Sequence, residues 1–190
     1  MRKVIYSMQM SHDGYIEDAS GSIGFTNPDR ELHEYVNALE AKADTHIYGR
    51  RLYEVMNGFW PTAEDDPDAA PEIVEYARIW NALDKVVFSR TLKSVEGRAR
   101  LAESDIASEV AKLKVASGKE ISVGGATLAQ SFIDLDLIDE YRVIVYPTLL
   151  GGGKPMFGSL ARQVDLTLVE SRSFASGVVV LIYRPTNREV

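Results

Sequence analysis

The chain has 190 residues, 45% of them hydrophobic and 26% charged, a balance typical of one globular domain with a single core. Its 21 basic and 28 acidic residues give a net charge of -7, and no basic run is long enough to follow a phosphate backbone, so we expect no nucleic-acid partner. Cysteine is absent, and no apolar stretch has the length of a membrane span or of a signal-peptide core. We therefore expect a single domain over residues 1–190, in the cytoplasm and without a membrane partner.

The first part of the chain predicts a strand, a turn and a helix. Residues 4–10 form an apolar run that ends before the turn-forming pair Asp13 and Gly14. Asn27 is a favourable N-cap, and Pro28 is a favourable first residue of a helix. The helix carries apolar residues at i, i+3, i+4 and i+7, which are Leu32, Tyr35, Val36 and Leu39.

The middle of the chain alternates short strands with helices. We expect strands at residues 45–49, 85–89 and 120–123, each next to a segment with helical periodicity. Ser104 is the expected N-cap of the helix before the last of these strands, and Leu135 should point inward from the helix after it. An acidic loop at 61–71 could hold a metal ion, but a solvated surface is the interpretation that we favour.

The C-terminal part is predicted to consist mainly of strands. They cover residues 141–146, 164–174 and 178–184, and a short turn at 175–177 joins the last two. Strands that alternate with helices and then continue alone are typical of an α/β fold, in which a mostly parallel sheet ends in an antiparallel hairpin.

Three strand-to-helix or strand-to-loop junctions are candidates for ligand binding, because ligands of open α/β sheets bind outside the carboxyl ends of the strands. They are Gly49-Arg50-Arg51, Ser89-Arg90-Thr91 and Gly124-Gly125-Ala126-Thr127. The glycine pair lets a diphosphate approach the backbone, and the helix after it adds a partial positive charge. The arginines could hold a further phosphate, so the junctions together predict a dinucleotide site that prefers a phosphorylated ribose.

Plainer interpretations of these signals stay open. A glycine pair before a helix can be only a tight turn, and the fingerprint G-x-G-x-x-G is missing. The glycine-rich run at 149–158 is not a phosphate loop, since Pro155 follows Lys154. The histidines lack the spacing of metal ligands, so we expect no metal site. They are His12, His33 and His46.

The order of several motifs resembles that of a known superfamily. Along the chain stand SHDGYI (11–16), DTHIYGRRLYE (44–54), VFSRTL (87–92), VGGATL (123–128) and LIDEYRVIVYPTLLGGGKPMF (137–157). As a set they resemble the dihydrofolate reductase-like superfamily, in particular the branch related to the C-terminal reductase domain of the bifunctional riboflavin-biosynthesis deaminase-reductase. The resemblance implies a three-layer α/β fold with a mixed, mostly parallel sheet of about eight strands, NADPH as the cofactor, and a homodimer.

The resemblance also implies roles for particular residues. The cofactor diphosphate would contact Gly124, Gly125, Ala126, Thr127 and Leu128. The helix that begins after the second strand would bind the cofactor through Gly49, Arg50, Arg51 and Leu52. The 2′-phosphate would meet Ser89, Arg90 and Thr91. The turn after the first strand would border the substrate through Asp13, Gly14, Tyr15 and Ile16.

Sequence differences from the related enzymes leave the identity of the substrate undetermined. The first helix offers Asp29, Glu31 and Glu34 where dihydrofolate reductases keep one carboxylate, and no spacing selects among them. Tyr15 and Val123 stand where riboflavin-pathway reductases commonly have lysine and an acidic residue.

We therefore hypothesise an NADPH-dependent reductase that transfers a hydride to a small heterocyclic or carbonyl substrate, with a proton from Asp13, Tyr15 or a water held by them. The substrate would lie between the nicotinamide, the 11–16 turn and the pair Phe59 and Trp60, of which Trp60 could instead be a core residue. One alternative is a nucleotide-binding homodimeric module without catalytic turnover. Another is a structural homodimer that uses the apolar segment 137–150 as its interface.

Overall fold

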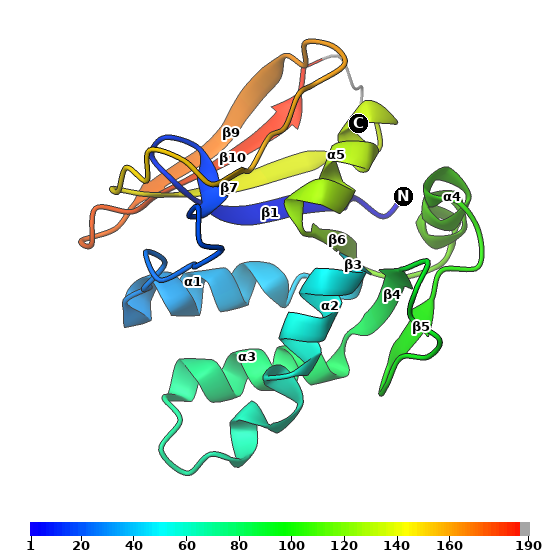
Figure 1. Cartoon of the computed structure of the whole chain (residues 1–190), viewed down its shortest axis with the longest axis horizontal. Helices are drawn as coiled ribbons and strands as arrows, with labels where there is room; N and C mark the ends of the chain where they lie inside the picture. Colours follow the sequence, from blue (N-terminus) through cyan, green and yellow to red (C-terminus); the bar gives the residue numbers. More distant parts are fainter. Residues whose placement is uncertain (187–190) are drawn as a thin grey trace.

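The computed structural model describes residues 1–186, and its centre is an eight-stranded sheet with helices on both faces (Figure 1). The strand order is β5-β4-β3-β6-β1-β7-β10-β9. The strands are β1 (Val4–Ser11), β3 (Ala43–Gly49), β4 (Asp84–Phe88), β5 (Ala99–Leu101), β6 (Glu120–Gly124), β7 (Glu140–Tyr146), β9 (Leu166–Ser173) and β10 (Val179–Pro185). A separate ribbon pairs β2 (Tyr15–Glu17) with β8 (Lys154–Pro155).

The helices lie between the strands along the chain. They are α1 (Arg30–Glu40), α2 (Arg50–Asn57), α3 (Pro71–Ala82), α4 (Ile106–Val115) and α5 (Ala126–Asp134), with a short 3-10 helix, η1 (Trp60–Asp65), between α2 and α3. All neighbouring strand pairs from β5 to β7 are parallel, whereas β10 pairs antiparallel with both β7 and β9. The predicted α/β fold, with a mostly parallel sheet and a C-terminal antiparallel hairpin, is confirmed.

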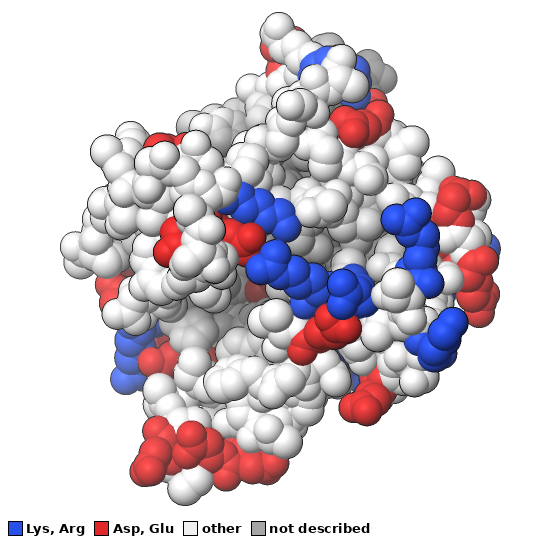
Figure 2. Space-filling model, in the orientation of Figure 1, with Lys and Arg blue, Asp and Glu red and all other residues white. Residues whose placement is uncertain are grey.

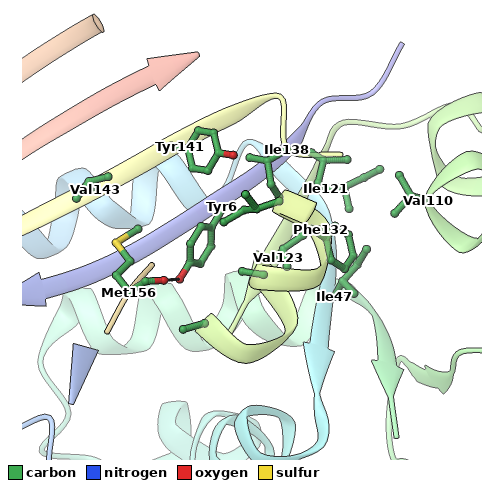
Figure 3. Close-up of a cluster of buried hydrophobic side chains, with 14 of the residues drawn as sticks. Tyr6, Ile47, Val110, Ile121, Val123, Phe132, Ile138, Tyr141, Val143 and Met156 are labelled. Atoms are coloured by element: carbon green, nitrogen blue, oxygen red, sulfur yellow. Dashed lines mark hydrogen bonds between the residues drawn. The ribbon is translucent and has the colours of Figure 1, made fainter. Parts of the chain in front are cut away.

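The sheet separates two hydrophobic clusters, because alternate residues of a strand point to opposite faces. On one face Tyr141 and Val143 of β7 join a cluster with Phe132 of α5, shown in Figure 3. On the other face Ile144 and Tyr146 of β7 join a cluster that includes Leu32 and Leu39 of α1. Helix α3 packs outside α1 on this second side (Figure 1). Both faces are thus covered, as the buried parallel strands require.

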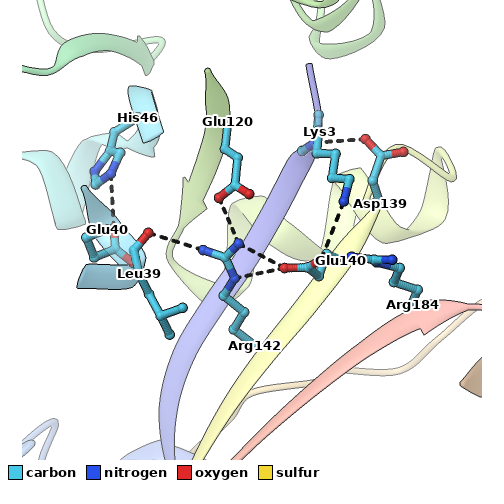
Figure 4. Close-up of polar contacts among 10 residues, drawn as sticks. Lys3, Leu39, Glu40, His46, Glu120, Asp139, Glu140, Arg142 and Arg184 are labelled. Carbon is cyan, nitrogen blue, oxygen red and sulfur yellow. Dashed lines mark hydrogen bonds and ion pairs between the residues drawn. The ribbon is translucent and has the colours of Figure 1, made fainter. Parts of the chain in front are cut away.

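A buried arginine ties α1 to the sheet (Figure 4). Arg142 of β7 makes ion pairs with Glu120 at 2.7 Å and with Glu140 at 2.8 Å, and it donates a 3.4 Å hydrogen bond to the carbonyl of Leu39. Its side chain is only 5% exposed, so these partners supply the charge compensation that burial demands. The contact holds the last turn of α1, and with it Glu40, against the sheet.

Several local predictions were wrong. Helix α1 is capped by Asp29, which accepts a 2.9 Å hydrogen bond from the N–H of Leu32, so Asn27 lies before the helix. Helix α4 is capped by Asp105, one residue after the predicted Ser104. Leu135 follows the end of α5 and is 50% exposed instead of buried. Each cap lies among several residues that can cap a helix, and local pattern does not choose between them.

Two strands differ from expectation: β5 was not expected at all, and β9 has a different first residue and is exposed. The three-residue strand β5 was not predicted, because a segment so short shows no periodicity. The strand predicted at 164–174 is β9, which begins at Leu166 and is exposed at every position.

The segment 137–150, predicted as the interface of a structural homodimer, is buried in its strand, whereas Leu149 beyond the strand is 72% exposed, and the homodimer stays a prediction. Its strand β7 is hydrogen-bonded to β1 on one side and to β10 on the other, and nearly all of its residues are buried. The apolar pattern of the segment reflects burial on both faces of a central strand.

We expect Glu109→Gln to lower the free energy of unfolding at neutral pH by about 2 kcal/mol, because the Glu109 carboxylate is fully buried and hydrogen-bonded. Burial alone would raise the pKa of Glu109, but donors from Arg100, the Glu103 backbone and Ser104 lower it to about 2. The pKa is depressed in the folded state, so this stabilisation is present above pH 4.5 and disappears as the pH falls toward 2.

Urea unfolding of the wild-type and Glu109→Gln proteins between pH 7 and pH 3 measures this difference. Glu103→Gln is the matched control, since Glu103 is exposed and contributes its backbone N–H to the network. A difference between wild type and Glu109→Gln that does not shrink with falling pH would contradict the assignment.

Candidate functional site

The three predicted junctions lie side by side at one end of the sheet. Strands β4, β3 and β6 are neighbours and parallel, with Gly49 beside Phe88 and Tyr48 beside Gly124. The segments that leave these strands therefore start next to one another. The sheet brings together Gly49 at the start of α2, Ser89 after β4, and the glycine pair before α5.

The glycine pair is shaped by its neighbours and by its own backbone. A Cβ on Gly124 would lie 2.8 Å from atoms of Leu52 and Tyr48, so no side chain fits there without movement. Gly125 is the N-cap residue of α5 and has a φ of 91°, a conformation that L residues rarely adopt. The turn therefore requires glycine at both positions, for two different reasons. Ala126, Thr127 and Leu128 form the first turn of α5.

The predicted cationic residues line the outside of this region. Arg50 is exposed and pairs with Glu54 at 2.9 Å, and Arg51 lies 3.5 Å from Glu17. Arg90 is also exposed and makes no ion pair with the described residues. On the face seen in Figure 2, Lys and Arg side chains cross the middle of the molecule over α2, beside a hollow.

The side chain of Ser89 shapes the junction after β4. Its Oγ accepts hydrogen bonds from the backbone N–H groups of Thr91 and Leu92, at 3.1 and 2.9 Å. The serine therefore closes a tight turn, which leaves Arg90 at the tip and exposed.

A cavity of about 460 Å³ opens beside the glycine pair, on the face of the sheet that α1 covers. Alternate residues of four neighbouring strands point into it: Ser7 and Gln9 of β1, His46 and Tyr48 of β3, Ser122 and Gly124 of β6, and Ile144 and Tyr146 of β7. Apolar side chains from the helices and from the turn before η1 complete its wall, including Val36, Leu52, Met56, Phe59 and Trp60. Leu52 and Gly124 thus border both the cavity and the junctions. Trp60, predicted either at the substrate or in the core, lies in the cavity wall.

A chain of polar contacts forms part of the cavity lining. Trp80 donates a 3.2 Å hydrogen bond to the hydroxyl of Tyr48, and this hydroxyl lies 2.5 Å from Nδ1 of His46. Nε2 of His46 lies 3.1 Å from Oε2 of Glu40, although the N–H direction is not aligned as in a straight hydrogen bond (Figure 4). His46 is 3% exposed and Glu40 is 9% exposed.

The surroundings keep Glu40 ionised and Tyr48 protonated. Burial alone would raise the pKa of Glu40, but His46, Arg142 and Ser7 outweigh it, and the net shift of the pKa is downward. Burial raises the pKa of Tyr48 far above its usual range, so its hydroxyl retains its proton. Glu40 therefore contributes a buried carboxylate to the cavity lining.

Neither of the predicted catalytic residues, Asp13 and Tyr15, is among the described residues that line the cavity. Asp13 accepts hydrogen bonds from Ser11 Oγ at 2.6 Å and from the N–H groups of Leu150 and Gly151, so it ties the β1–β2 turn to the loop before β8. The Ser11 hydroxyl and these amides lower the pKa of Asp13 to about 2, so it is ionised at neutral pH and unsuited to donate a proton. Tyr15 lies in the β2–β8 ribbon, and Ile16 next to it lines the cavity.

Sequence reasoning missed Glu40, His46 and Tyr48 as site residues. A signal was present, since parallel strands buried on both faces are normally apolar throughout. Ser7 and Gln9, like His46 and Tyr48, interrupt such strands with polar groups at alternate positions and so mark one face. The pairing with Glu40 had no local signal, because it depends on how α1 packs.

The described residues contain no group of three or more His, Asp or Glu side chains that could hold a metal ion. Within the same part of the chain, every helix is too short or too polar to cross a membrane.

Comparison with known sequences relates the chain to one family over nearly its whole length. The family model described as "RibD C-terminal domain" matches residues 2–180. The uncharacterized protein YyaP of Bacillus subtilis (strain 168) is 35% identical over 185 residues, which cover 96% of this chain and 94% of YyaP. YwjB of the same organism, also uncharacterized, is 27% identical over 182 residues and is covered to 95%.

Solved structures have the same fold. A Shewanella sp. PV-4 protein provisionally assigned to riboflavin biosynthesis superposes with a TM-score of 0.77 at 25% identity, over 97% of this chain and 99% of that one. A pyrimidine reductase-like protein from Corynebacterium diphtheriae gives 0.67 at 14% identity, over 98% and 93%. The diaminohydroxyphosphoribosylaminopyrimidine deaminase/5-amino-6-(5-phosphoribosylamino)uracil reductase of Thermotoga maritima also gives 0.67, at 15% identity, and this chain covers 56% of it.

Proposed function

The chain belongs to the RibD C-terminal domain family, and on this premise we propose that it is an NADPH-dependent reductase that transfers a hydride to a small pyrimidine-like heterocycle. The family is reductase-like, which supports a reductase acting on a substrate of this kind. The observation that carries the proposal is the cavity whose wall includes Gly124, because it joins a substrate-sized space to the glycine turn and its flanking arginines.

The residues present fit a dinucleotide. The Gly124–Gly125 turn leaves the backbone bare where α5 begins, and the N–H groups of its first turn suit a diphosphate. The N-terminal end of α2, with Arg50 and Arg51, offers a second set of donors. Arg90 at the tip of the third junction suits the 2′-phosphate, since its guanidinium has no ion-pair partner among the described residues.

When bound, NADPH would supply the hydride, and the protein would supply orientation of the cofactor and the substrate. The apolar wall from Leu52, Met56 and Trp60 would hold a planar ring beside Gly124. The proton that completes the reduction would come from water admitted to the cavity, because Asp13 is ionised and bound to two loops.

Fluorescence titration with NADPH and NADH, followed by absorbance assays of NADPH oxidation with a panel of pyrimidines and pterins, tests the proposal. NADPH should bind more tightly than NADH, and at least one pyrimidine should support oxidation. Absence of binding by either cofactor would overturn it. Tight binding without oxidation of any substrate would favour the alternative of a nucleotide-binding homodimeric module without turnover.

We expect Arg90→Ala to weaken NADPH binding about tenfold or more and to leave NADH binding nearly unchanged, because only NADPH carries the 2′-phosphate. The same titrations measure both dissociation constants. Arg78→Ala is the matched control, because Arg78 is an exposed arginine that pairs with Glu64 at 3.1 Å outside the three junctions. Equal losses for NADPH and NADH in Arg90→Ala would show that Arg90 does not contact the 2′-phosphate.

A further inference from the structure

The buried carboxylate of Glu40 indicates which kind of heterocycle the cavity accepts. We infer that Glu40 binds adjacent ring N–H and amino groups of the substrate, and that this substrate carries no phosphate. That the bound heterocycle is also reduced rests on the proposed function. Glu40 lies outside the three junctions proposed to bind the cofactor.

The polar chain behind Glu40 has a defined direction. The indole N–H of Trp80 can only donate, so the Tyr48 oxygen is its acceptor. Tyr48 keeps its proton and, at 2.5 Å, donates it to Nδ1 of His46. With Nδ1 as the acceptor, the ring N–H of His46 is on Nε2, the nitrogen that faces Glu40. The chain therefore presents an N–H to the carboxylate and helps to hold it as an anion.

Glu40 has acceptor capacity that the protein leaves unused. Among the described residues, His46 and Ser7 are its hydrogen-bonding neighbours, and Arg142 acts on it as a more distant charge. The hydroxyls of Tyr48 and Tyr76 also lie close enough for the Glu40 charge to raise their pKa. An ionised carboxylate has about four lone-pair positions, so at least two can accept from a ligand in the cavity. A buried carboxylate with open positions favours a ligand that brings N–H donors. Two parallel donors on one planar ring match its two oxygens.

The same charge disfavours phosphate. Among the described residues that line the cavity there is no lysine or arginine, whereas Glu40 supplies a negative charge. A phosphate placed there would face Glu40 in surroundings that screen charge poorly and would lose its hydration without a lysine or arginine partner. The nearby arginines, Arg50 and Arg51, lie outside on α2, in the region proposed for the cofactor.

Isothermal titration calorimetry with two matched probes tests the inference. The probes are 5,6-diaminouracil and its phosphoribosyl derivative on the 6-amino nitrogen, each titrated into the full-length protein with and without NADPH. We expect 5,6-diaminouracil to bind at least tenfold more tightly than the phosphoribosyl derivative. In Glu40→Gln its affinity should fall about 10- to 100-fold while NADPH affinity stays unchanged. Glu34→Gln, on the exposed side of α1, should match wild type.

A ligand-side test covers the case in which Glu40→Gln does not fold. 5,6-Diamino-1,3-dimethyluracil lacks the ring N–H groups, so the wild-type protein should bind it at least tenfold more weakly than 5,6-diaminouracil. Equal affinity for these two uracils, or tighter binding of the phosphoribosyl derivative, would overturn the inference. Failure of NADPH to bind the wild-type protein would instead overturn the proposed function, and the uracil comparisons without NADPH would still decide the role of Glu40.

Discussion

Gly153→Ala is expected to lower the free energy of unfolding by about 3 to 5 kcal/mol, the largest effect on stability among the substitutions considered for this protein. A Cβ on Gly153 would lie 2.0 Å from the carbonyl oxygen of Glu17 and 2.9 Å from backbone atoms of Asp18. These are main-chain atoms, so relief requires separation of β2 from β8. Gly153 also has a φ of 135°, which adds backbone strain.

Urea unfolding of three alanine variants in the same loop separates the two causes. Gly152→Ala should be close to wild type, since Gly152 has no positive φ and a Cβ there has nothing within 4 Å. Gly151→Ala adds strain alone, because its φ is 71° and its surroundings are open, and it should cost about 1 kcal/mol. If Gly153→Ala were no less stable than Gly151→Ala, the close approach to Glu17 would not exist in solution.

Gly124→Ala is expected to cost about 2 to 3 kcal/mol of stability and to weaken NADPH binding at least tenfold. The new Cβ would lie 2.8 Å from the ring of Tyr48 and from Cδ2 of Leu52. Leu52 can rotate away, but Tyr48 is held by hydrogen bonds with His46 and Trp80. The ring must therefore shift, which disturbs the polar chain and the floor on which the proposed cofactor lies.

Comparison of Gly125→Ala with Gly124→Ala distinguishes backbone strain from steric crowding at the same turn. A Cβ on Gly125 would be 3.6 Å from Leu52, an ordinary contact, but its φ of 91° makes alanine unfavourable by about 1 to 2 kcal/mol. Unfolding measurements and NADPH titrations of both variants should give the larger loss of stability for Gly124→Ala. The opposite order would mean that Tyr48 is less firmly held than its contacts indicate.

The sequence predicted much of the fold because the relevant information is local. Apolar periodicity located β1, β3, β4, β6 and β7, and glycine after β6 marked the turn into α5. Errors arose where several residues could do the same local task, as with Asn27 and Asp29 before α1. They also arose where a strand such as β5 was too short to show a period.

The site was predictable only in part. Gly49 and Gly124 end their strands and Ser89 directly follows one, so parallel pairing of adjacent strands was enough to bring them together. Asp13 had no such guide, because its partners, Leu150 and Gly151, are far away in the sequence. The carboxylate that looked like a proton donor therefore holds two loops together.

The sequence by itself determined the order of strands and helices, the glycine turn and the arginines beside it, since each depends on residues close together in the chain. Only the tertiary structure decided that Glu40 would meet His46, that the Tyr48 hydroxyl would lie 2.5 Å from that histidine, and that the three would border one cavity. The physical reason is that the partners of a buried charge come from separate elements of the chain, and packing of α1 against the sheet brings these partners together.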